Sequence, residues 1–180
     1  LNITMGYSLK KTQVFSLINF WWDLQKQSVQ GKFSVSLFKS VCSHGLIDLY
    51  IQQKSKVQKR DFKRELNELY TKTDLYVRSD KILTLAADLP ILKELFAPSF
   101  NAFVAILKCQ ETLLELILKS IPDQQWDQEA EAVKQALAVI ESLILSFEAD
   151  DFASIASGKI VLTQLLSQQK LTFVGAENRS

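Results

Sequence analysis

The sequence predicts an all-α protein, and two observations lead to this fold class. The first is that no glycine occurs between Gly45 and Gly158, whereas sheet-rich folds need glycine at hairpin turns and bulges. The second is that apolar residues within that stretch recur at the spacing of helix faces. We therefore expect a bundle of six to seven helices with a buried central helix.

The length and composition are those of a globular chain. Of the 180 residues, 47% are hydrophobic and 23% are charged, and a chain of this size buries roughly 70% of the surface that its unfolded form exposes. We expect a single helical domain over residues 1–180, with residues 1–7 and 171–180 as loose tails. A fragment of an α-solenoid is the alternative, because the residues from Glu111 echo those from Glu141.

The first predicted helix runs from about residue 8 to residue 27. Polar residues that include Asp23 lie on one side, and apolar residues that include Leu17 and Trp21 lie on the other. Gly31 lies in the break that follows this helix.

A second helical stretch covers roughly residues 35–57, and Ser34 is a candidate N-cap for it. Gly45 interrupts the stretch, so it forms either two helices or one kinked helix. The run over residues 32–37 alternates between polar and apolar residues as a strand does, but it is too short to change the predicted fold class.

The middle of the chain predicts shorter helices. One runs from about residue 58 to residue 71. Another opens at Ser79 or Asp80 and ends at Leu89, before Pro90. Pro90 also fits the first turn of a further short helix that ends near Phe96.

The central helix is predicted between Pro98 and Pro122, with Ser99 as its candidate cap. Apart from a narrow polar stripe, nearly every residue in it is apolar, which is typical of a helix that is buried on several sides. The stripe consists of Asn101, Ala105, Lys108, Thr112, Glu115 and Lys119.

Two more helices are predicted at about residues 127–147 and 152–169. Acidic residues stand at the start of each, where negative charge favours a helix N-terminus. Gly158 lies within the predicted helix 152–169 or marks its true start. The segment Ser157-Gly158-Lys159 is similar to the end of a phosphate-binding loop, but Ile160 stands where such a loop carries Ser or Thr.

Residue types that carry chemistry are scarce. His44 is the only histidine, and a nucleophile–base pair with Cys42 is disfavoured because residues two apart on a helix point away from each other. The carboxylates Glu148, Asp150 and Asp151 lack the alternation and the glycine of a calcium loop. We therefore predict no catalytic residue, no metal site and no cofactor, and we do not expect an enzyme.

The two cysteines, Cys42 and Cys109, lie on apolar helical stretches and are interpreted as buried free thiols. Free thiols are typical of a reducing compartment. Neither a signal-peptide pattern nor a membrane span stands out in the sequence. These patterns favour an intracellular protein, and within the cell a cytoplasmic one.

A basic run is the sharpest functional feature. Only Asp61 opposes six positive charges in this run, and most of the six share one side of the predicted helix. Such a surface contacts a partner protein, or the phosphates of nucleic acid or anionic lipid; the alternative is an ordinary solvated helix surface. The candidate contacts are Lys54, Lys56, Lys59, Arg60, Lys63 and Arg64.

Trp22 is the other candidate partner contact. It follows Trp21, and adjacent residues on a helix point about a quarter turn apart, so one ring can lie in the core while the other lies on the surface. Packing of both rings in the core is the alternative.

The charge distribution along the chain would suit contact between unlike surfaces, but a chance distribution over solvated helix faces is the preferred interpretation. Residues 1–110 contain 16 Lys or Arg and 9 Asp or Glu, while residues 111–180 contain 5 and 11. The leading functional hypothesis is a non-enzymatic interaction or scaffold module that binds another protein, with self-association left open. The alternatives are a carrier of a lipid or pigment in an apolar cavity, and a protein that binds nucleic acid or anionic lipid through residues 54–64.

Overall fold

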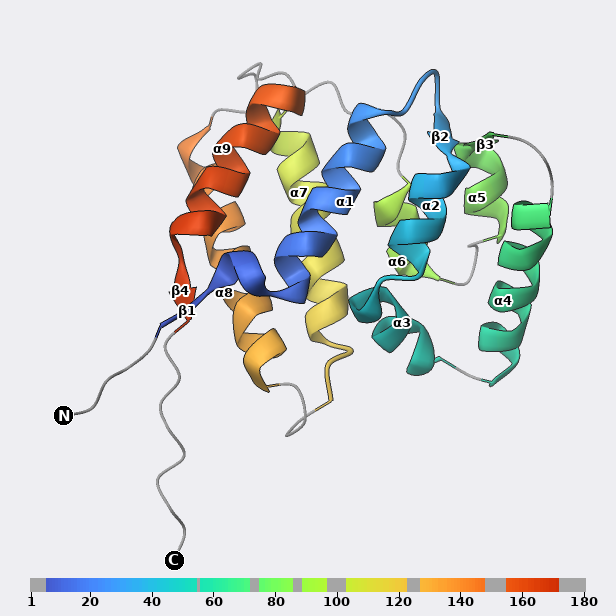
Figure 1. Ribbon diagram of the computed structural model, residues 1–180, viewed down its shortest axis with the longest axis horizontal. Coiled ribbons are helices and arrows are strands. Elements are labelled where there is room, and N and C mark those ends of the chain that lie inside the picture. The colour runs from blue at the N-terminus through green and yellow to red at the C-terminus, as the bar shows by residue number, and fades with distance from the viewer. Residues whose placement is uncertain are drawn as a thin grey trace, which may run out of the picture.

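The computed structural model confirms the all-α class. It describes residues 6–54, 56–71, 75–85, 89–96, 103–122, 127–147 and 155–171. In these residues the chain forms nine α-helices, one short 3-10 helix and four strands of two or three residues (Figure 1). The helices are η1 (Leu9–Lys11), α1 (Gln13–Lys26), α2 (Val35–Cys42), α3 (Gly45–Gln52), α4 (Lys56–Thr71), α5 (Ser79–Leu85), α6 (Pro90–Leu95), α7 (Phe103–Leu118), α8 (Asp127–Ser146) and α9 (Ile155–Gln168).

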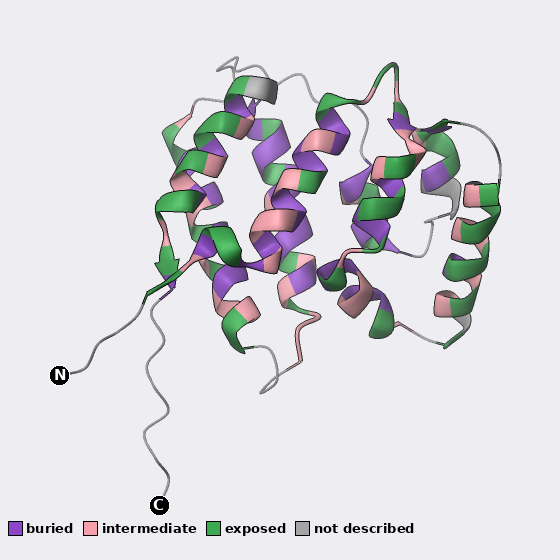
Figure 2. Cartoon of the chain, viewed as in Figure 1, coloured by how far each residue is buried: buried purple, intermediate pink, exposed green. Residues whose placement is uncertain are grey.

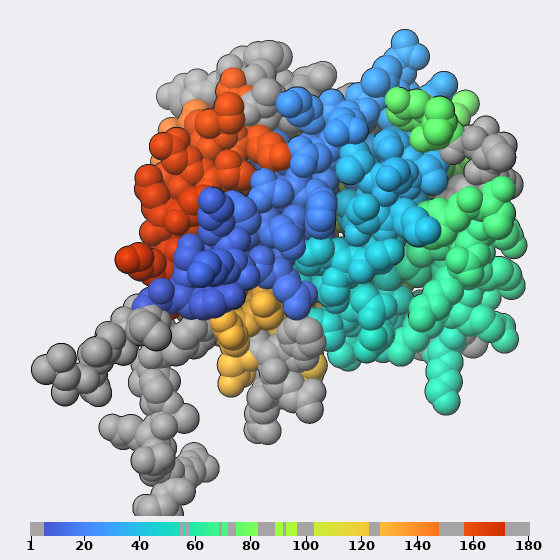
Figure 3. Space-filling view, in the orientation of Figure 1, coloured from blue at the N-terminus to red at the C-terminus, as the bar shows by residue number. Residues whose placement is uncertain are grey.

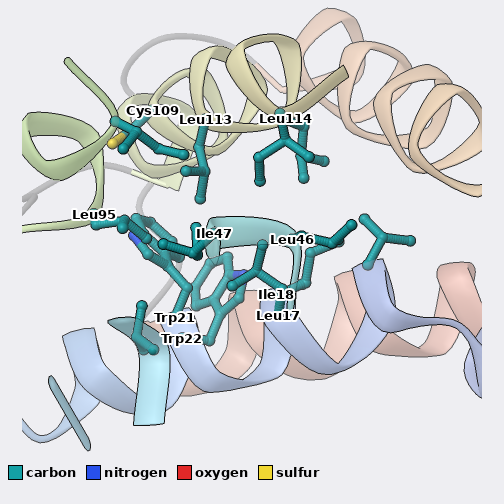
Figure 4. Close-up of a cluster of buried hydrophobic side chains, with 14 of the residues drawn as sticks. Leu17, Ile18, Trp21, Trp22, Leu46, Ile47, Leu95, Cys109, Leu113 and Leu114 are labelled. Atoms are coloured by element: carbon teal, nitrogen blue, oxygen red, sulfur yellow. The ribbon is translucent and has the colours of Figure 1, made fainter. Parts of the chain in front are cut away.

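Helix α1 is in contact with helices from both the early and the late parts of the chain. The Thr12 hydroxyl caps it by accepting a hydrogen bond from the Phe15 amide at 3.4 Å. It packs against α2, α3, α8 and α9, so apolar side chains on more than one side of it are buried. Figure 4 shows its Leu17 and Ile18 in one cluster with Leu46 of α3 and Leu113 of α7.

Helix α7 has the two faces that the sequence predicts. Its apolar side chains are buried against α3, α6 and α8, while Ala105, Lys108, Thr112, Glu115 and Lys119 are all exposed. Asn101, the first residue of the predicted stripe, lies outside the described residues, as does the candidate cap Ser99. The expected buried central helix with a narrow polar stripe is therefore present over Phe103–Leu118.

The nine α-helices of the described residues exceed the expected six to seven, because the stretch 35–57 is divided and two separate short helices precede α7. Helix α2 ends at Cys42, and α3 begins at Gly45 with His44 as its N-cap. Helix α4 then begins at Lys56. Short helices α5 and α6 fill the segment before α7, as the proline at position 90 indicated.

Two short antiparallel ribbons connect distant parts of the chain. Strand β2 (Lys32–Ser34) pairs with β3 (Tyr76–Arg78), so the alternating run after Gly31 begins as a strand and continues as α2. A turn with positive φ at Gln30 (51°) and Gly31 (71°) precedes β2, as two-residue hairpin turns require.

The second ribbon joins the two ends of the fold. Strand β1 (Tyr7–Ser8) pairs with β4 (Lys170–Leu171), and Leu171 is buried. The expectation that residues 7 and 171 belong to loose tails is therefore wrong, because their backbones share a ladder; residues 1–5 and 172–180 lie outside the described residues. Repeats of a solenoid contact only their neighbours, whereas α1 here contacts α8 and α9.

Gly158 lies inside α9 and does not mark its start. A Cβ at this position would lie 2.5 Å from the Phe103 ring and 3.3 Å from the Trp22 ring. The next residue, Lys159, forms an ion pair with Asp23 of α1. This segment, which is similar in sequence to a phosphate loop, therefore packs α9 onto α1. No helix in the described ranges is long and apolar enough to cross a membrane.

Candidate interaction surfaces

Helix α4 forms one edge of the molecule (Figures 1 and 3). Its apolar residues recur at a spacing of four, and they hold it against the core through the buried Phe62 and the partly buried Leu66 and Tyr70. The Tyr70 ring packs against Phe38 of α2, with the ring centroids 6.4 Å apart. The rest of the circumference of α4 faces outward, and much of it is exposed in Figure 2.

Most of the predicted basic residues lie on the outward part of α4. Lys56, Arg60, Lys63 and Arg64 are exposed, and Lys59 is half-buried at the edge of the apolar face. The side chains of Arg60 and Arg64 are 76% and 60% exposed, and both guanidinium groups lie within 4 Å of Asp61. Within the described ranges, no carboxylate lies within ion-pair distance of the three lysines. We call these five residues the basic flank of α4.

Acidic residues follow a different side of the same helix. A rotation of about 100° per residue places Asp61, Glu65 and Glu68 together, between the basic flank and the apolar face. Helix α4 therefore carries three separate stripes, one basic, one acidic and one apolar. A surface of this kind presents both signs of charge to anything larger than a single helix.

Lys54 does not belong to the basic flank. It lies in the turn between α3 and α4, and its ammonium group lies 4.4 Å from the centroid of the Tyr50 ring on α3, which is cation–π distance. Lys39 of α2 extends the basic area instead, since its ammonium group lies 5.0 Å from the Tyr70 ring of α4. Sequence reasoning missed Lys39, because nothing local indicates that α2 lies beside α4.

Trp22 is not a surface contact. Its side chain is 0% exposed, and its indole N–H donates a hydrogen bond to Gln110 Oε1 of α7 at 3.2 Å. Trp21 is equally buried and meets Trp22 edge to face. The prediction that one ring could lie on the surface is wrong for Trp22. Neighbouring helices cover α1 both on the side to which Trp21 points and on the side to which Trp22 points.

His44 caps helix α3 and forms a hydrogen bond with Ser16 of α1. Its Nδ1 accepts a hydrogen bond from the Leu46 amide, so in the neutral ring Nε2 carries the proton. Nε2 lies 2.8 Å from Ser16 Oγ and donates to it, while the Ser16 hydroxyl donates to the Gln13 carbonyl. A histidine that activates a serine must accept the hydroxyl proton instead. Burial lowers the pKa of His44, which favours this neutral form.

The two cysteines are free and buried, as predicted. Burial is the main reason that the pKa of each thiol lies far above its usual range, and for Cys109 the neighbouring Glu94 adds to the effect. The Cys109 thiol donates to the Glu94 carbonyl at 3.1 Å. In the part of the chain that the structure describes, no three His, Cys, Asp or Glu side chains gather closely enough to hold a metal ion.

A second surface feature is a groove of about 560 Å³ between α8 and α9. It is open to solvent, and none of the residues that line it is charged. Such an open groove does not favour the carrier hypothesis, which requires an enclosed apolar cavity. The lining residues are Gln135, Ala138, Val139, Ser142, Leu143, Ser146, Leu165 and Gln169.

Comparison with known proteins adds no functional assignment. No protein-family model, no curated protein and no solved structure matches this chain. The α4 surface and the α8–α9 groove are therefore interpreted from their own chemistry.

Proposed function

We propose that this protein is a non-enzymatic interaction module that binds an acidic surface of another protein through the basic flank of α4. The observation that carries this proposal is the position of α4 at an edge of the molecule, with Lys56 and Lys63 exposed and without a carboxylate in ion-pair distance among the described residues. Exposed charges of this kind steer and orient association with a surface of opposite charge.

The acidic stripe of α4 favours a protein over nucleic acid as the partner. A duplex carries negative charge along its whole length, so it would meet Asp61, Glu65 and Glu68 together with the lysines. A protein surface can offer both signs of charge and match each stripe. The net charge of the chain is only +1, whereas proteins that bind nucleic acid through phosphates are commonly strongly basic.

The arrangement of the reactive side chains supports a role without catalysis. His44 caps a helix and donates to Ser16, so it is not placed to remove a proton from that hydroxyl. The thiols of Cys42 and Cys109 are buried, and burial raises the pKa of both, so the nucleophilic thiolate is disfavoured.

The test reverses two charges of the basic flank. The variant Lys56→Glu/Lys63→Glu changes exposed side chains only, so its thermal stability should match that of the wild type. We expect its partner affinity to fall by at least about tenfold, because two attractive contacts become repulsive. The measurement is affinity purification with mass spectrometry, followed by titration of the recovered protein at low and high salt.

The matched control is Lys10→Glu/Lys11→Glu, which makes the same change in net charge on exposed residues of η1. The control should retain the partner. If the two variants behave alike, the proposal is wrong, because net charge and not α4 would then govern binding. Titrations with a 20-base-pair duplex and with phosphatidylserine vesicles test the alternatives; tight binding of either probe that the α4 variant abolishes would replace the protein partner.

A further inference from the structure

The outer surface of α8 and α9 is poor in charge where the two helices meet. All eight residues that line the groove are uncharged, and Lys159, the only charged residue of α9, is paired with Asp23. Charged residues make up 23% of the chain, whereas the lining of this groove contains none. Depletion of charge is typical of the core of a protein–protein interface.

Large apolar side chains border this groove in exposed positions. Leu145 of α8 is 87% exposed and Val161 of α9 is 38% exposed. Val161 stands one helical turn before Leu165, which lines the groove, so both lie on the same flank of α9. Leu145 lies on the solvent-facing side of α8, next to the residues that line the groove. Exposed apolar side chains beside an uncharged groove favour a docking surface over an ordinary solvated face.

The solvent-facing side of α8 beside the groove, which we call the crest, has charges that can pair with those of a second copy of itself. Lys134, Ala138, Glu141 and Leu145 recur at spacings of three and four, and all are exposed. Two copies of α8 that cross in antiparallel orientation near Ala138 place Lys134 of one copy opposite Glu141 of the other, and the reverse pair forms by symmetry. In the described part of the chain, neither Lys134 nor Glu141 forms an ion pair.

The surroundings of Glu141 strengthen this complementarity. Glu141 acts on Glu111 of α7, and the charges of Glu115 and Glu141 both raise the pKa of Glu111, after burial as the main cause. The charge of Lys108 has the opposite effect on Glu111, so three carboxylates and one lysine make a net negative area beside the crest. A lysine from a second copy would relieve the repulsion within that area.

We propose that two copies of this chain form a symmetric dimer through α8 and the α8–α9 groove. The two α8 helices cross near Ala138, which lies close to the two-fold axis, and the crest of each runs along the groove of the other copy. Leu145 of one copy then lies near the end of the other copy's groove that Gln135 lines. The dimer uses neither α4 surface, so each dimer presents two basic flanks. This proposal therefore stands apart from the proposed function of α4.

The test is the mass of the protein in solution, measured by sedimentation equilibrium from about 1 to about 200 μM, a range that covers weak and moderate association. We expect the wild type to dimerise. Ala138→Arg places a long charged side chain on the axis, and it should weaken dimerisation by at least about tenfold. Ala138 is exposed, so the variant should keep its helix content and thermal stability.

A charge-swap series makes the test specific for this geometry. Lys134→Glu should weaken dimerisation, and Lys134→Glu/Glu141→Lys should restore it, because the swapped residues meet again across the two-fold axis. Lys63→Glu on α4 is the control and should leave the mass unchanged. A wild type that stays monomeric at the highest concentration overturns the proposal. So does a dimer that Ala138→Arg leaves unchanged, or one that the double swap does not restore.

Discussion

The side chain that is missing at Gly158 determines how closely α9 approaches the core. The Phe103 ring that a Cβ would meet at 2.5 Å is itself only 1% exposed. It packs against Trp22 and Phe147, so it cannot move into solvent. A helix interior normally prefers alanine to glycine by about 1 kcal/mol. The packing here outweighs that preference, because overpacked cores lose about 1–3 kcal/mol.

We predict that Gly158→Ala lowers the free energy of unfolding by up to about 2 kcal/mol, which is the packing loss of about 1–3 kcal/mol less the helix preference for alanine of about 1 kcal/mol. Urea denaturation of the variant and the wild type measures the change. The control is Gly45→Ala, where the new Cβ would meet only the end of the flexible Gln13 side chain at 2.7 Å. Gly45 is exposed, so we expect a change within about 0.5 kcal/mol there. A Gly158→Ala variant at least as stable as the wild type would contradict the packing argument.

At the scale of the element, His44 explains why one predicted helical stretch becomes two helices. The imidazole accepts the Leu46 amide and so satisfies a donor that the start of α3 leaves unpaired. A serine, threonine, aspartate or asparagine usually has this role. The cap therefore depends on a lone pair that protonation removes. The residue that caps α3 is thus a titratable one, and its charged form cannot accept the Leu46 amide.

We predict that the protein loses stability as the pH falls below 6.5, through His44. Burial lowers the pKa of His44 from 6.5, so the unfolded chain binds the proton more readily than the folded chain does. The contribution of neutral His44 to the free energy of unfolding is therefore complete above pH 6.5, and it decreases as the pH falls toward the pKa of the folded state. Free energies of unfolding at about pH 7.5 and about pH 5.5 measure this loss.

The variant His44→Asn is the control, because asparagine caps helices and does not titrate in this range. The carboxyl groups Glu111 and Glu129, whose pKa values burial raises, change stability in the opposite direction on acidification. They are present in both proteins, so they cancel in the difference between wild type and variant. An equal loss of stability in both proteins would show that His44 is not responsible.

At the scale of the whole molecule, one hydrophobic cluster extends from Leu9 in η1 to Leu171 in β4. The β1–β4 ribbon joins the two ends of the fold, and α1 contacts both early and late helices. Contacts between residues far apart in sequence make it difficult for one part of the chain to unfold alone.

We predict a single cooperative unfolding transition, as expected for one domain. Urea curves followed by far-ultraviolet and near-ultraviolet circular dichroism should coincide, because secondary structure and aromatic packing are then lost together. Two separate transitions would contradict the prediction of a single domain over residues 1–180. The Ala138→Arg variant is a suitable sample for this measurement, since dissociation of a dimer would otherwise add a dependence on concentration.

Several features of the fold and of the α4 surface could be predicted from the sequence, because they are local. The polar stripe of α7 and the basic run of α4 follow from the spacing of residues along one helix. Lys39 and Lys54 show where this reasoning ends. Lys54 lies over the ring of Tyr50, four residues earlier in the chain, whereas Lys39 lies over the Tyr70 ring only because α2 packs beside α4. The sequence therefore places the charge on α4 correctly but misjudges its borders.

Periodicity and composition act within single segments, and they are enough to predict the helical class, the exposed and buried faces of α7, and the scarcity of reactive groups. Packing between distant segments accounts for three features that the local patterns do not predict: the burial of Trp22, the pairing of the two ends in a ribbon, and the uncharged groove between α8 and α9. Helical periodicity shows which face of a segment is apolar. It does not show which distant segment covers that face, or whether any does.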